Sequence, residues 1–351
     1  MTPWQRNIKN KITKLFSWEY WPMSVVYFPA GIYYIYLSIR AKSFFFFSAS
    51  NPTIETGGMF FESKSKIFEL IPKEFLPKTI LITEHTSQSE MLIEYSAAGF
   101  TFPVVAKPDR GERGWGVSII NSIDELLEYK KYHPIDFQIQ EYIDYPVELS
   151  VFYYRSPNDV NGIITSVTSK ELLAVLGDGK SSIQQLVEKM PRALLQYDIL
   201  HKQFGDKWNY ILPLNQKKVL VPYGNHVRGA LFLDFCHEID ESLINVFDML
   251  SKRIEGFYFG RYDLKCKSID DLKRGVNFKI VELNGAGAEP AHIYQPGFSF
   301  LKAQKVIINH FKMMFDASVK NNKKGVRYLT YKEYKELKKS EKLYKMKVTS
   351  L

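Results

Sequence analysis

The sequence contains little cysteine. Cys236 and Cys266 are the only two among 351 residues, and their spacing fits neither a disulfide framework nor a metal-binding cysteine motif. The pair therefore argues against a disulfide-stabilised secreted fold and favours a reducing compartment, so a cytoplasmic protein is expected. With 45% hydrophobic and 24% charged residues, the composition is that of a folded globular chain.

The sequence also lacks a segment suited to span a bilayer. The charge-free stretch from Met23 to Ile39 has 17 residues and is interrupted by Pro29 and Gly31, whereas a spanning helix needs about 20 predominantly apolar residues. No small-residue cleavage site follows it, so a signal peptide is not indicated. Residues 18–47 are rich in aromatic side chains, and two interpretations stay open: packing on the protein or a partner, or peripheral membrane contact.

The basic charge of the chain is concentrated at its two ends. The formal net charge is +9, but residues 320–347 carry an excess of +8 and the first 17 residues add four cations without an acid. The remainder of the chain is therefore close to −3. Because no motif of DNA or RNA readout accompanies this charge, nucleic-acid binding is not expected.

The pattern of apolar residues predicts three segments and an α+β fold. Residues 1–77 form an aromatic N-terminal region, residues 78–319 the main domain, and residues 320–351 a basic helical tail. In the main domain, apolar runs and turn residues predict the following elements. Strands are expected at 80–83, 102–108, 117–120, 137–143, 147–155, 162–177, 260–268 and 276–284, and helices at 87–99, 122–132, 177–190, 240–253 and 300–317.

The last pair of expected strands carries three oxygen-bearing side chains. Asp263 lies on the first, and Glu282 and Asn284 lie two apart on the second, so the latter two project from one face. If the strands pair as a hairpin, the three side chains converge. Carboxylate and amide oxygens suit Mg²⁺, which also keeps water and phosphate ligands. On their own, however, such residues are common on surface strands.

A lysine and a glycine-bearing loop follow an apolar strand. Lys107 ends the strand at 102–108, and a buried ammonium needs a polar partner such as phosphate. The loop 109–116 contains Gly111, Gly114 and Gly116, whose backbone N–H groups can approach phosphates. The loop matches neither a Walker A motif nor GxGxxG. The stretch 177–182 (GDGKSS) lacks the Walker spacing too and predicts a turn before a helix.

The segment QEYIDYPVELSV places Glu141 and Glu148 seven residues apart between two apolar strands. A short linker between lobes offers backbone donors and acceptors to a purine, and a nearby carboxylate accepts both ribose hydroxyls.

Taken in order, FPVVAKP, the glycine loop, QEYIDYPVE, GRYD and VELN resemble the ATP-grasp superfamily, and within it the D-alanine–D-alanine ligase-like branch. The resemblance covers residues 78–315. It implies two α+β lobes with ATP between them, and an N-terminal region that departs from the family. It also implies an ADP-forming ligase that joins a small-molecule carboxylate to an amine through an acyl phosphate.

The resemblance also assigns roles to residues of this chain. Lys107 would contact the α- and β-phosphates, and the glycine loop would cover the triphosphate. Glu141 and the backbone of Tyr142 and Ile143 would meet adenine, while Glu148 would hold the ribose. Asp263, Glu282 and Asn284 would ligate two Mg²⁺ ions, with Mn²⁺ as a substitute. Arg261 would steady the acyl phosphate.

Other roles remain open. Lys64 and Lys66 compete for a further phosphate contact, and Lys170 is a candidate for the γ-phosphate. The segment 284–297 departs from the ligase motif where the acceptor would bind, so D-alanine specificity does not transfer. Side chains that could anchor an acidic substrate there are His226, Arg228, Glu289 and His292. Arg261, Lys170 and Arg228 are the catalytic candidates.

Two other functions compete with the ligase. One is a kinase that uses the same ATP site on a small acceptor, and the other is a nucleotide-binding protein without turnover. The sequence indicates neither the substrates nor the oligomeric state.

Overall fold

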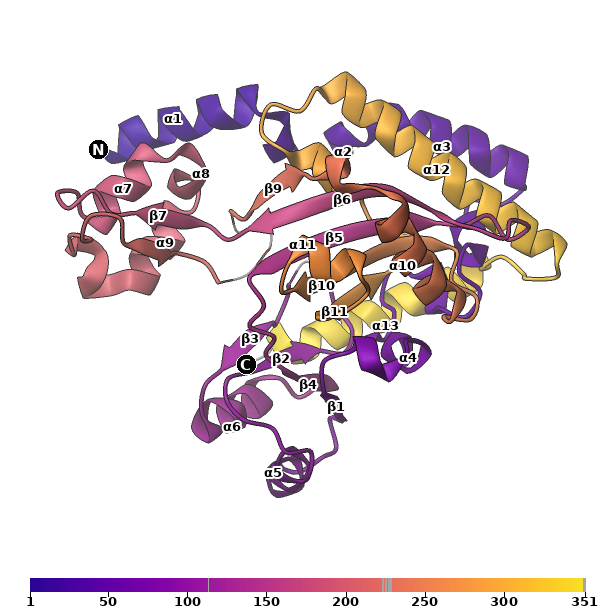
Figure 1. Ribbon diagram of the computed structural model, residues 1–351, viewed down its shortest axis with the longest axis horizontal. Coiled ribbons are helices and arrows are strands. Elements are labelled where there is room, and N and C mark those ends of the chain that lie inside the picture. The colour runs from indigo at the N-terminus through magenta and orange to yellow at the C-terminus, as the bar shows by residue number, and fades with distance from the viewer. Residues whose placement is uncertain (113, 223, 225, 227–228, 350–351) are drawn as a thin grey trace.

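Two antiparallel β-sheets in separate lobes organise the computed structural model (Figure 1). The structure describes residues 1–112, 114–222, 224, 226 and 229–349. The small lobe has the strand order β1-β4-β2-β3, with β1 (Thr79–Ile82), β2 (Val104–Pro108), β3 (Ser118–Ile120) and β4 (Phe137–Glu141). The large lobe has the order β11-β10-β5-β6-β9, with β5 (Val147–Tyr154), β6 (Ile163–Glu171), β9 (Leu231–Asp234), β10 (Phe259–Cys266) and β11 (Phe278–Asn284).

The small lobe is a two-layer sandwich of sheet and helices. Helices α5 (Gln88–Ala97) and α6 (Ile123–Tyr132) bury apolar side chains against alternate residues of the strands, among them Val104, Ala106 and Ile139. Ser87 and Ser122 cap the two helices by accepting hydrogen bonds from backbone N–H groups three residues on. The other face of this sheet faces the large lobe.

The large-lobe sheet buries one face completely and the other in part. Helix α10 (Glu241–Lys252), with α4 (Lys64–Leu70) and α11 (Ile269–Lys273), covers a face lined by residues such as Val151, Tyr262 and Leu264. On the opposite face, Phe152 and Phe259 pack under α12 (Phe300–Lys323) and a cluster of phenylalanines. The rest of that face carries polar side chains and forms the floor of the cleft between the lobes.

The N-terminal region is largely helical and shares the core of the large lobe. It contains α1 (Pro3–Phe16), α2 (Met23–Val26), α3 (Phe28–Ala41) and a 3-10 turn at Phe46–Ala49. Phe46 and Phe47 join the core beneath α12, and Ile67 joins the core beneath α10. Residues 1–77 therefore differ from the rest of the chain in composition, but their buried side chains belong to the same hydrophobic cores as those of the large lobe.

A small subdomain projects from the large lobe, at the left of Figure 1. It contains the two-stranded sheet β7 (Ala174–Leu176) and β8 (Lys217–Val219), with helices α7 (Ile183–Lys189), α8 (Pro191–Leu194) and α9 (Tyr197–Phe204). Its core, which includes Leu194, Leu200 and Trp208, is separate from those of the lobes.

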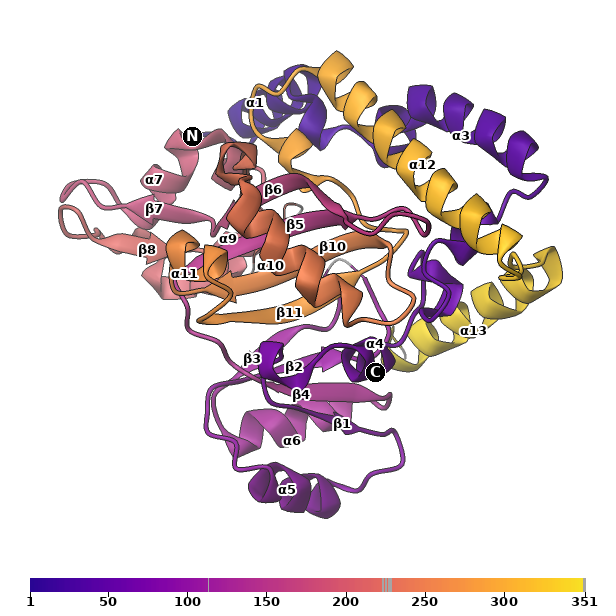
Figure 2. The ribbon, with the colours of Figure 1, turned by 45° about the vertical axis from the view of Figure 1, so that its right-hand side comes forward.

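The C-terminal helix connects the two lobes from outside the cleft (Figure 2). After α12 ends at Lys323, helix α13 (Tyr331–Thr349) begins beside the N-terminal phenylalanines, where Tyr334 stacks on Phe45. At its far end the Tyr344 hydroxyl donates to the carbonyl of Asp136 in the small lobe, at 2.9 Å.

The expectation of an α+β fold with two lobes is confirmed, and most expected elements lie where the sequence placed them. The strand expected at 162–177 is instead two strands, β6 and β7, in different sheets. The connection between β10 and β11 contains the helix α11. The tail expected from residue 320 begins inside α12. Among the described residues, no helix combines the length and hydropathy that crossing a bilayer requires.

Asn51 provides a test of how the N-terminal region is held. Its buried amide donates to the carbonyls of Gly57 and Phe259 and accepts from the N–H groups of Tyr258 and Phe259. Asn51→Ala leaves these buried groups unpaired, so we expect the free energy of unfolding to fall by about 3 kcal/mol, as measured by urea denaturation. Asn161→Ala, at an exposed position, is the control. A loss below about 1 kcal/mol in Asn51→Ala would contradict this role.

Candidate functional site

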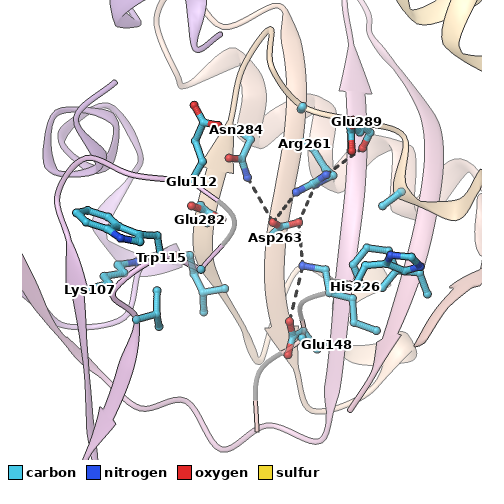
Figure 3. Close-up of a pocket in the computed structure, with 18 of the residues that line it drawn as sticks. Lys107, Glu112, Trp115, Glu148, His226, Arg261, Asp263, Glu282, Asn284 and Glu289 are labelled. Carbon is cyan, nitrogen blue, oxygen red and sulfur yellow. Dashed lines mark hydrogen bonds and ion pairs between the residues drawn. The ribbon is translucent and has the colours of Figure 1, made fainter. Parts of the chain in front are cut away.

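A cavity of about 710 Å³ separates the two lobes. The polar part of the large-lobe sheet forms its floor, and β2, β4 and the glycine loop of the small lobe face it. Figure 3 shows Asp263, Arg261 and Asn284 grouped on the floor, with Lys107 and Trp115 approaching from the small lobe.

Pairing of β10 with β11 brings the three expected oxygen-bearing side chains together. The strands are antiparallel, with Asp263 opposite Glu282 and Arg261 opposite Asn284. Residues directly opposite in a sheet project from the same face, so all four side chains reach the cleft. The convergence that the spacing suggested is thus present in the structure.

Asp263 accepts hydrogen bonds on both carboxylate oxygens. Arg261 donates to Oδ1 and Oδ2 at 2.9 and 3.0 Å. Ser150 donates to Oδ1 at 2.5 Å, and Asn284 donates to Oδ2 at 3.3 Å. The Lys170 ammonium lies 3.3 Å from Oδ1. A carboxylate has about four acceptor positions, so in this arrangement those of Asp263 are filled.

The cations around Asp263 determine its charge. Burial alone would raise the pKa of the Asp263 carboxyl, but the charges of Arg261 and Lys170 outweigh burial and hold that pKa well below its ordinary value. Burial acts to lower the pKa of Arg261, but the carboxylate of Asp263 more than compensates and raises it. The Asp263–Arg261 pair on the floor of the cleft is therefore held in its charged form.

Lys107 crosses the cleft from the end of β2. Its Nζ donates to the Val281 carbonyl of the large lobe at 3.0 Å and to Gln140 Oε1 at 3.2 Å. The register of β10 and β11 shifts after Asp263, and such a bulge frees the backbone groups of the extra residue, here Val281. Burial lowers the pKa of Lys107 to about 8, although Glu282 acts in the opposite direction.

The glycine loop folds over this end of the cleft. Gly111, Gly114 and Gly116 all have positive φ, a conformation that side chains disfavour. At Gly116 a Cβ atom would also lie 2.6 Å from Pro108, so glycine is required there. Arg110 is turned away from the cleft, because its guanidinium pairs with Glu55 at 2.7 Å. Arg113 lies outside the described residues.

The structure separates the two competing lysines of the N-terminal region. Lys64 lines the cavity, donates to the Gly111 carbonyl at 2.5 Å and lies 4.0 Å from Glu282. Lys66 pairs with Glu55 at 2.6 Å and is largely exposed. Of these two lysines, Lys64 is therefore the one placed to meet a ligand in the cleft.

The linker between the lobes also lines the cavity, through Glu141, Tyr142, Ile143 and Glu148. The Glu141 carboxylate accepts from the Lys78 N–H at 3.1 Å, which ties it to the edge of β1. Lys265 donates to the Ile143 carbonyl at 3.0 Å and so fixes the linker to β10. Lys170 lies 3.7 Å from Glu148 and thus connects it with Asp263.

The end of the cleft beyond Asn284 is enclosed by the N-terminal region. Glu19, Tyr20, Trp21 and Met23 line the cavity, and sequence reasoning did not place them there. Glu19 pairs with Arg192 at 2.8 Å with both side chains largely buried. No local signal in the sequence relates these two residues, which are 173 positions apart.

Glu289 and His226 belong to the same end. The Glu289 carboxylate accepts from the hydroxyls of Tyr27 at 2.7 Å and Tyr294 at 3.3 Å, and its carbonyl accepts from Arg261 at 3.0 Å. His226 stacks on Tyr20. His292 is buried and does not line the cavity. Arg228 lies outside the described residues.

Asp263, Glu282 and Asn284 could supply only part of the coordination shell of a hard cation. Glu282 is partly exposed to the cleft and pairs with Lys64 only at 4.0 Å, and Asn284 uses its amide nitrogen toward Asp263 and keeps its oxygen for another partner. Asp263 can coordinate a metal only if one of its present donors moves. Among the described residues, no group of three or more His, Cys, Asp or Glu side chains is placed to hold a metal ion, so ligand oxygens would have to complete the shell.

His226 generates a prediction about acid stability. Burial, together with the charge of Arg192, lowers its pKa to about 4. The unfolded chain therefore binds a proton that the folded chain excludes between pH 4 and the ordinary histidine pKa of 6.5. The free energy of unfolding consequently falls as the pH falls through this window. His226→Phe should reduce the slope of unfolding free energy against pH by up to about 1.4 kcal/mol per unit, measured by urea denaturation across that range. His85→Phe, at an exposed position, should leave the slope unchanged, and equal slopes in His226→Phe and the original protein would contradict the prediction.

Comparisons with known proteins give only distant likenesses. No protein-family model matches the chain, and no curated protein matches its sequence. A bifunctional glutathione synthetase from Pasteurella multocida is 18% identical over 71% of this chain and 36% of its own length, with a TM-score of 0.39. D-alanine–D-alanine ligase from Bacillus anthracis is 16% identical over 75% and 68%, with a TM-score of 0.42. VanG D-Ala:D-Ser ligase from Enterococcus faecalis is 15% identical over 71% and 61%, with a TM-score of 0.40. Likenesses at this level transfer neither an activity nor a residue assignment to this chain.

Proposed function

We propose that the cleft binds ATP with Mg²⁺ and that the protein is an ADP-forming ligase that joins a carboxylate to an amine. The observation that supports the proposal is that basic side chains, which suit phosphate, and oxygen-bearing side chains, which suit a divalent cation, line one cavity. Lys64 and Lys107 reach it from one side, and Glu282, Asn284 and Asp263 lie on the floor opposite them. Triphosphate and divalent cation need these two kinds of group at adjacent positions.

The nucleotide would lie along the cleft from the linker to the glycine loop. The strand and linker at residues 140–143 present backbone groups to a purine, and Glu148 lies at the edge of the same cavity. Lys107 and Lys64 would then meet the phosphates, each exchanging a carbonyl partner, Val281 or Gly111, for a charged oxygen. A charge-assisted hydrogen bond is stronger than the neutral one it replaces.

Magnesium, when bound, would neutralise the charge of the triphosphate and make its γ-phosphorus open to attack. Glu282 and the Asn284 oxygen would hold the ion. The acceptor positions of Asp263 are filled by its present donors. Asp263 would therefore join the metal ligands only after Arg261 turns toward the substrates or the Asn284 amide nitrogen moves away.

Arg261 and Lys170 would supply the catalytic charge. A substrate carboxylate would attack the γ-phosphorus and expel ADP to give an acyl phosphate. An amine would then attack the acyl carbon, and the tetrahedral oxyanion would collapse with loss of phosphate and of the amine proton. Arg261 lies between Asp263 and the Glu289 carbonyl, where its guanidinium can stabilise that oxyanion. Lys170, which contacts Asp263, would contact the γ-phosphate and stay with it as it is transferred. The chain contributes positioning and charge and needs no nucleophilic side chain of its own.

The metal-binding groups give the first test of this function. Glu282→Gln keeps the shape of the side chain but removes the charge, so turnover should fall at least about a hundredfold while ATP binding is retained. The assay combines the protein with ATP, Mg²⁺ and mixtures of carboxylates and amines, and follows ADP, phosphate and products by mass spectrometry.

The products of this assay separate the three candidate functions. ADP with free phosphate and a joined product supports a ligase, ADP with a phosphorylated acceptor identifies a kinase, and no ADP under any condition leaves a nucleotide-binding protein. Glu171→Gln, an exposed carboxylate at the end of β6, is the matched control. Full turnover in Glu282→Gln would overturn the metal assignment.

Lys107 gives a second test through pH. Because its pKa is lowered to about 8, the amine loses its charge as the pH rises from 7 to 9, and ATP affinity should weaken by up to about tenfold. Titration with a fluorescent ATP analogue would measure the dissociation constant at each pH. In Lys107→Met the affinity should be low and nearly independent of pH. If the original protein and Lys107→Met respond equally to pH, Lys107 does not hold the phosphates.

A further inference from the structure

Helix α1 lies on the protein with its polar side chains inward. Lys9 donates to the Glu188 carbonyl at 3.1 Å, and the guanidinium of Arg6 lies over the ring of Tyr197 at 3.9 Å. None of the residues of this helix is buried. Its apolar residues point to solvent instead and are 38% to 81% exposed; they are Trp4, Ile8, Ile12, Leu15 and Phe16. Amphipathic helices on globular proteins normally have the opposite orientation.

Helix α3 exposes a second apolar row. It packs on α12 through residues such as Ala30 and Leu37, but apolar residues on its outer side are 49% to 71% exposed. They are Phe28, Ile32, Ile35, Tyr36 and Ile39. Figures 1 and 2 both place α1 and α3 on the side of the molecule opposite the small-lobe helices α5 and α6.

Because α1 and α3 lie on the same side of the molecule, we name their exposed sides together the N-terminal face. Ten large apolar side chains on one side of a protein exceed the scattered apolar residues that soluble surfaces normally carry. Exposing these apolar side chains to water is unfavourable in free energy, and a partner that covers them removes this unfavourable contribution.

The charges of the N-terminal face indicate which partner fits. Residues 1–54 contain six Lys or Arg and a single acid, Glu19. Glu19 is turned inward and neutralised by Arg192, whereas Lys11, Arg40 and Lys42 are exposed. A second copy of this face would bring like charges together, which opposes self-association. An anionic lipid surface offers both opposite charge and an apolar layer.

We propose that the N-terminal face docks on an anionic membrane surface, with α1 and α3 lying in the plane of the interface. Each helix has 14 residues, or about 21 Å at 1.5 Å per residue, which is shorter than the apolar layer of a bilayer. The chain therefore lies on the membrane without crossing it. The outward Trp4 and Tyr36 are side chains that favour the headgroup region.

Vesicle co-sedimentation of the 351-residue protein tests the proposal. We expect binding to phosphatidylcholine vesicles that contain about one third phosphatidylglycerol, at least about tenfold weaker binding to phosphatidylcholine alone, and weakening as salt screens the charges. Leu15→Ser/Ile39→Ser, which changes one exposed residue on each helix, should reduce binding at least about fivefold. The matched control is Ile93→Ser/Ile123→Ser, two exposed positions on α5 and α6, and it should bind as the original protein does.

Tryptophan fluorescence keeps the test decisive if the double variant folds poorly. Trp4 is exposed, whereas the other four tryptophans are partly or fully buried. Lipids brominated near the headgroup should quench the fluorescence of the original protein, and Trp4→Phe should lose most of that quenching. Two results would overturn the proposal: no preference for anionic vesicles in the original protein, or equal binding by Leu15→Ser/Ile39→Ser. A dimer in gel filtration that Leu15→Ser/Ile39→Ser converts to a monomer, without vesicle binding, would instead assign the face to a contact between copies.

Discussion

The ionised carboxylate of Asp263, buried in the middle of the large-lobe sheet, is the constraint on which the site depends. An unpaired buried charge is costly enough that the group would take up a proton instead. Arg261, Lys170, Ser150 and Asn284 prevent this by donating to it or lying close to it. Arg261 lies on β10 with Asp263, Ser150 on β5, Lys170 on β6 and Asn284 on β11. The polar floor therefore exists only when these four strands are correctly paired.

If the cleft binds a metal ion and phosphate as proposed, the same network would rearrange when they bind. If one donor leaves Asp263, part of its negative charge is no longer compensated, and a divalent cation could compensate it instead. Arg261, once released, could then stabilise a negative charge that develops on the substrate. In the function proposed above, a metal and Arg261 would share one carboxylate, so binding of the metal would change the contacts of the arginine. Lys107 would behave comparably across the cleft, because in the proposed function a phosphate oxygen would replace the Val281 carbonyl to which it donates.

Local patterns in the sequence predicted those parts of the fold and site that depend on local chain geometry. The spacing of two between Glu282 and Asn284 predicted a shared face, and the apolar run before Lys107 predicted a strand that delivers the amine to the cleft. The bulge at Val281 could not be predicted, because it arises from the register between two strands. The enclosure of the cleft by Glu19 and Tyr20 depends on tertiary contacts between residues more than 170 positions apart. Such contacts cannot be predicted from the local pattern of apolar residues. The inverted orientation of α1 was hidden for a similar reason, since periodicity identifies an amphipathic helix but not which side faces the protein.

Helix α13 has a mechanical consequence for the cleft. The chain crosses between the lobes through the linker at residues 142–146 and again before β1, and α13 adds a third connection on the outside, held by Tyr344 at the small lobe. Two covalent crossings alone would act as a hinge. With the third in place, any wide separation of the lobes must release the Tyr344 hydroxyl from Asp136 or bend the seven residues between α12 and α13. The aperture through which a ligand enters is therefore limited by a helix that does not touch the floor of the site.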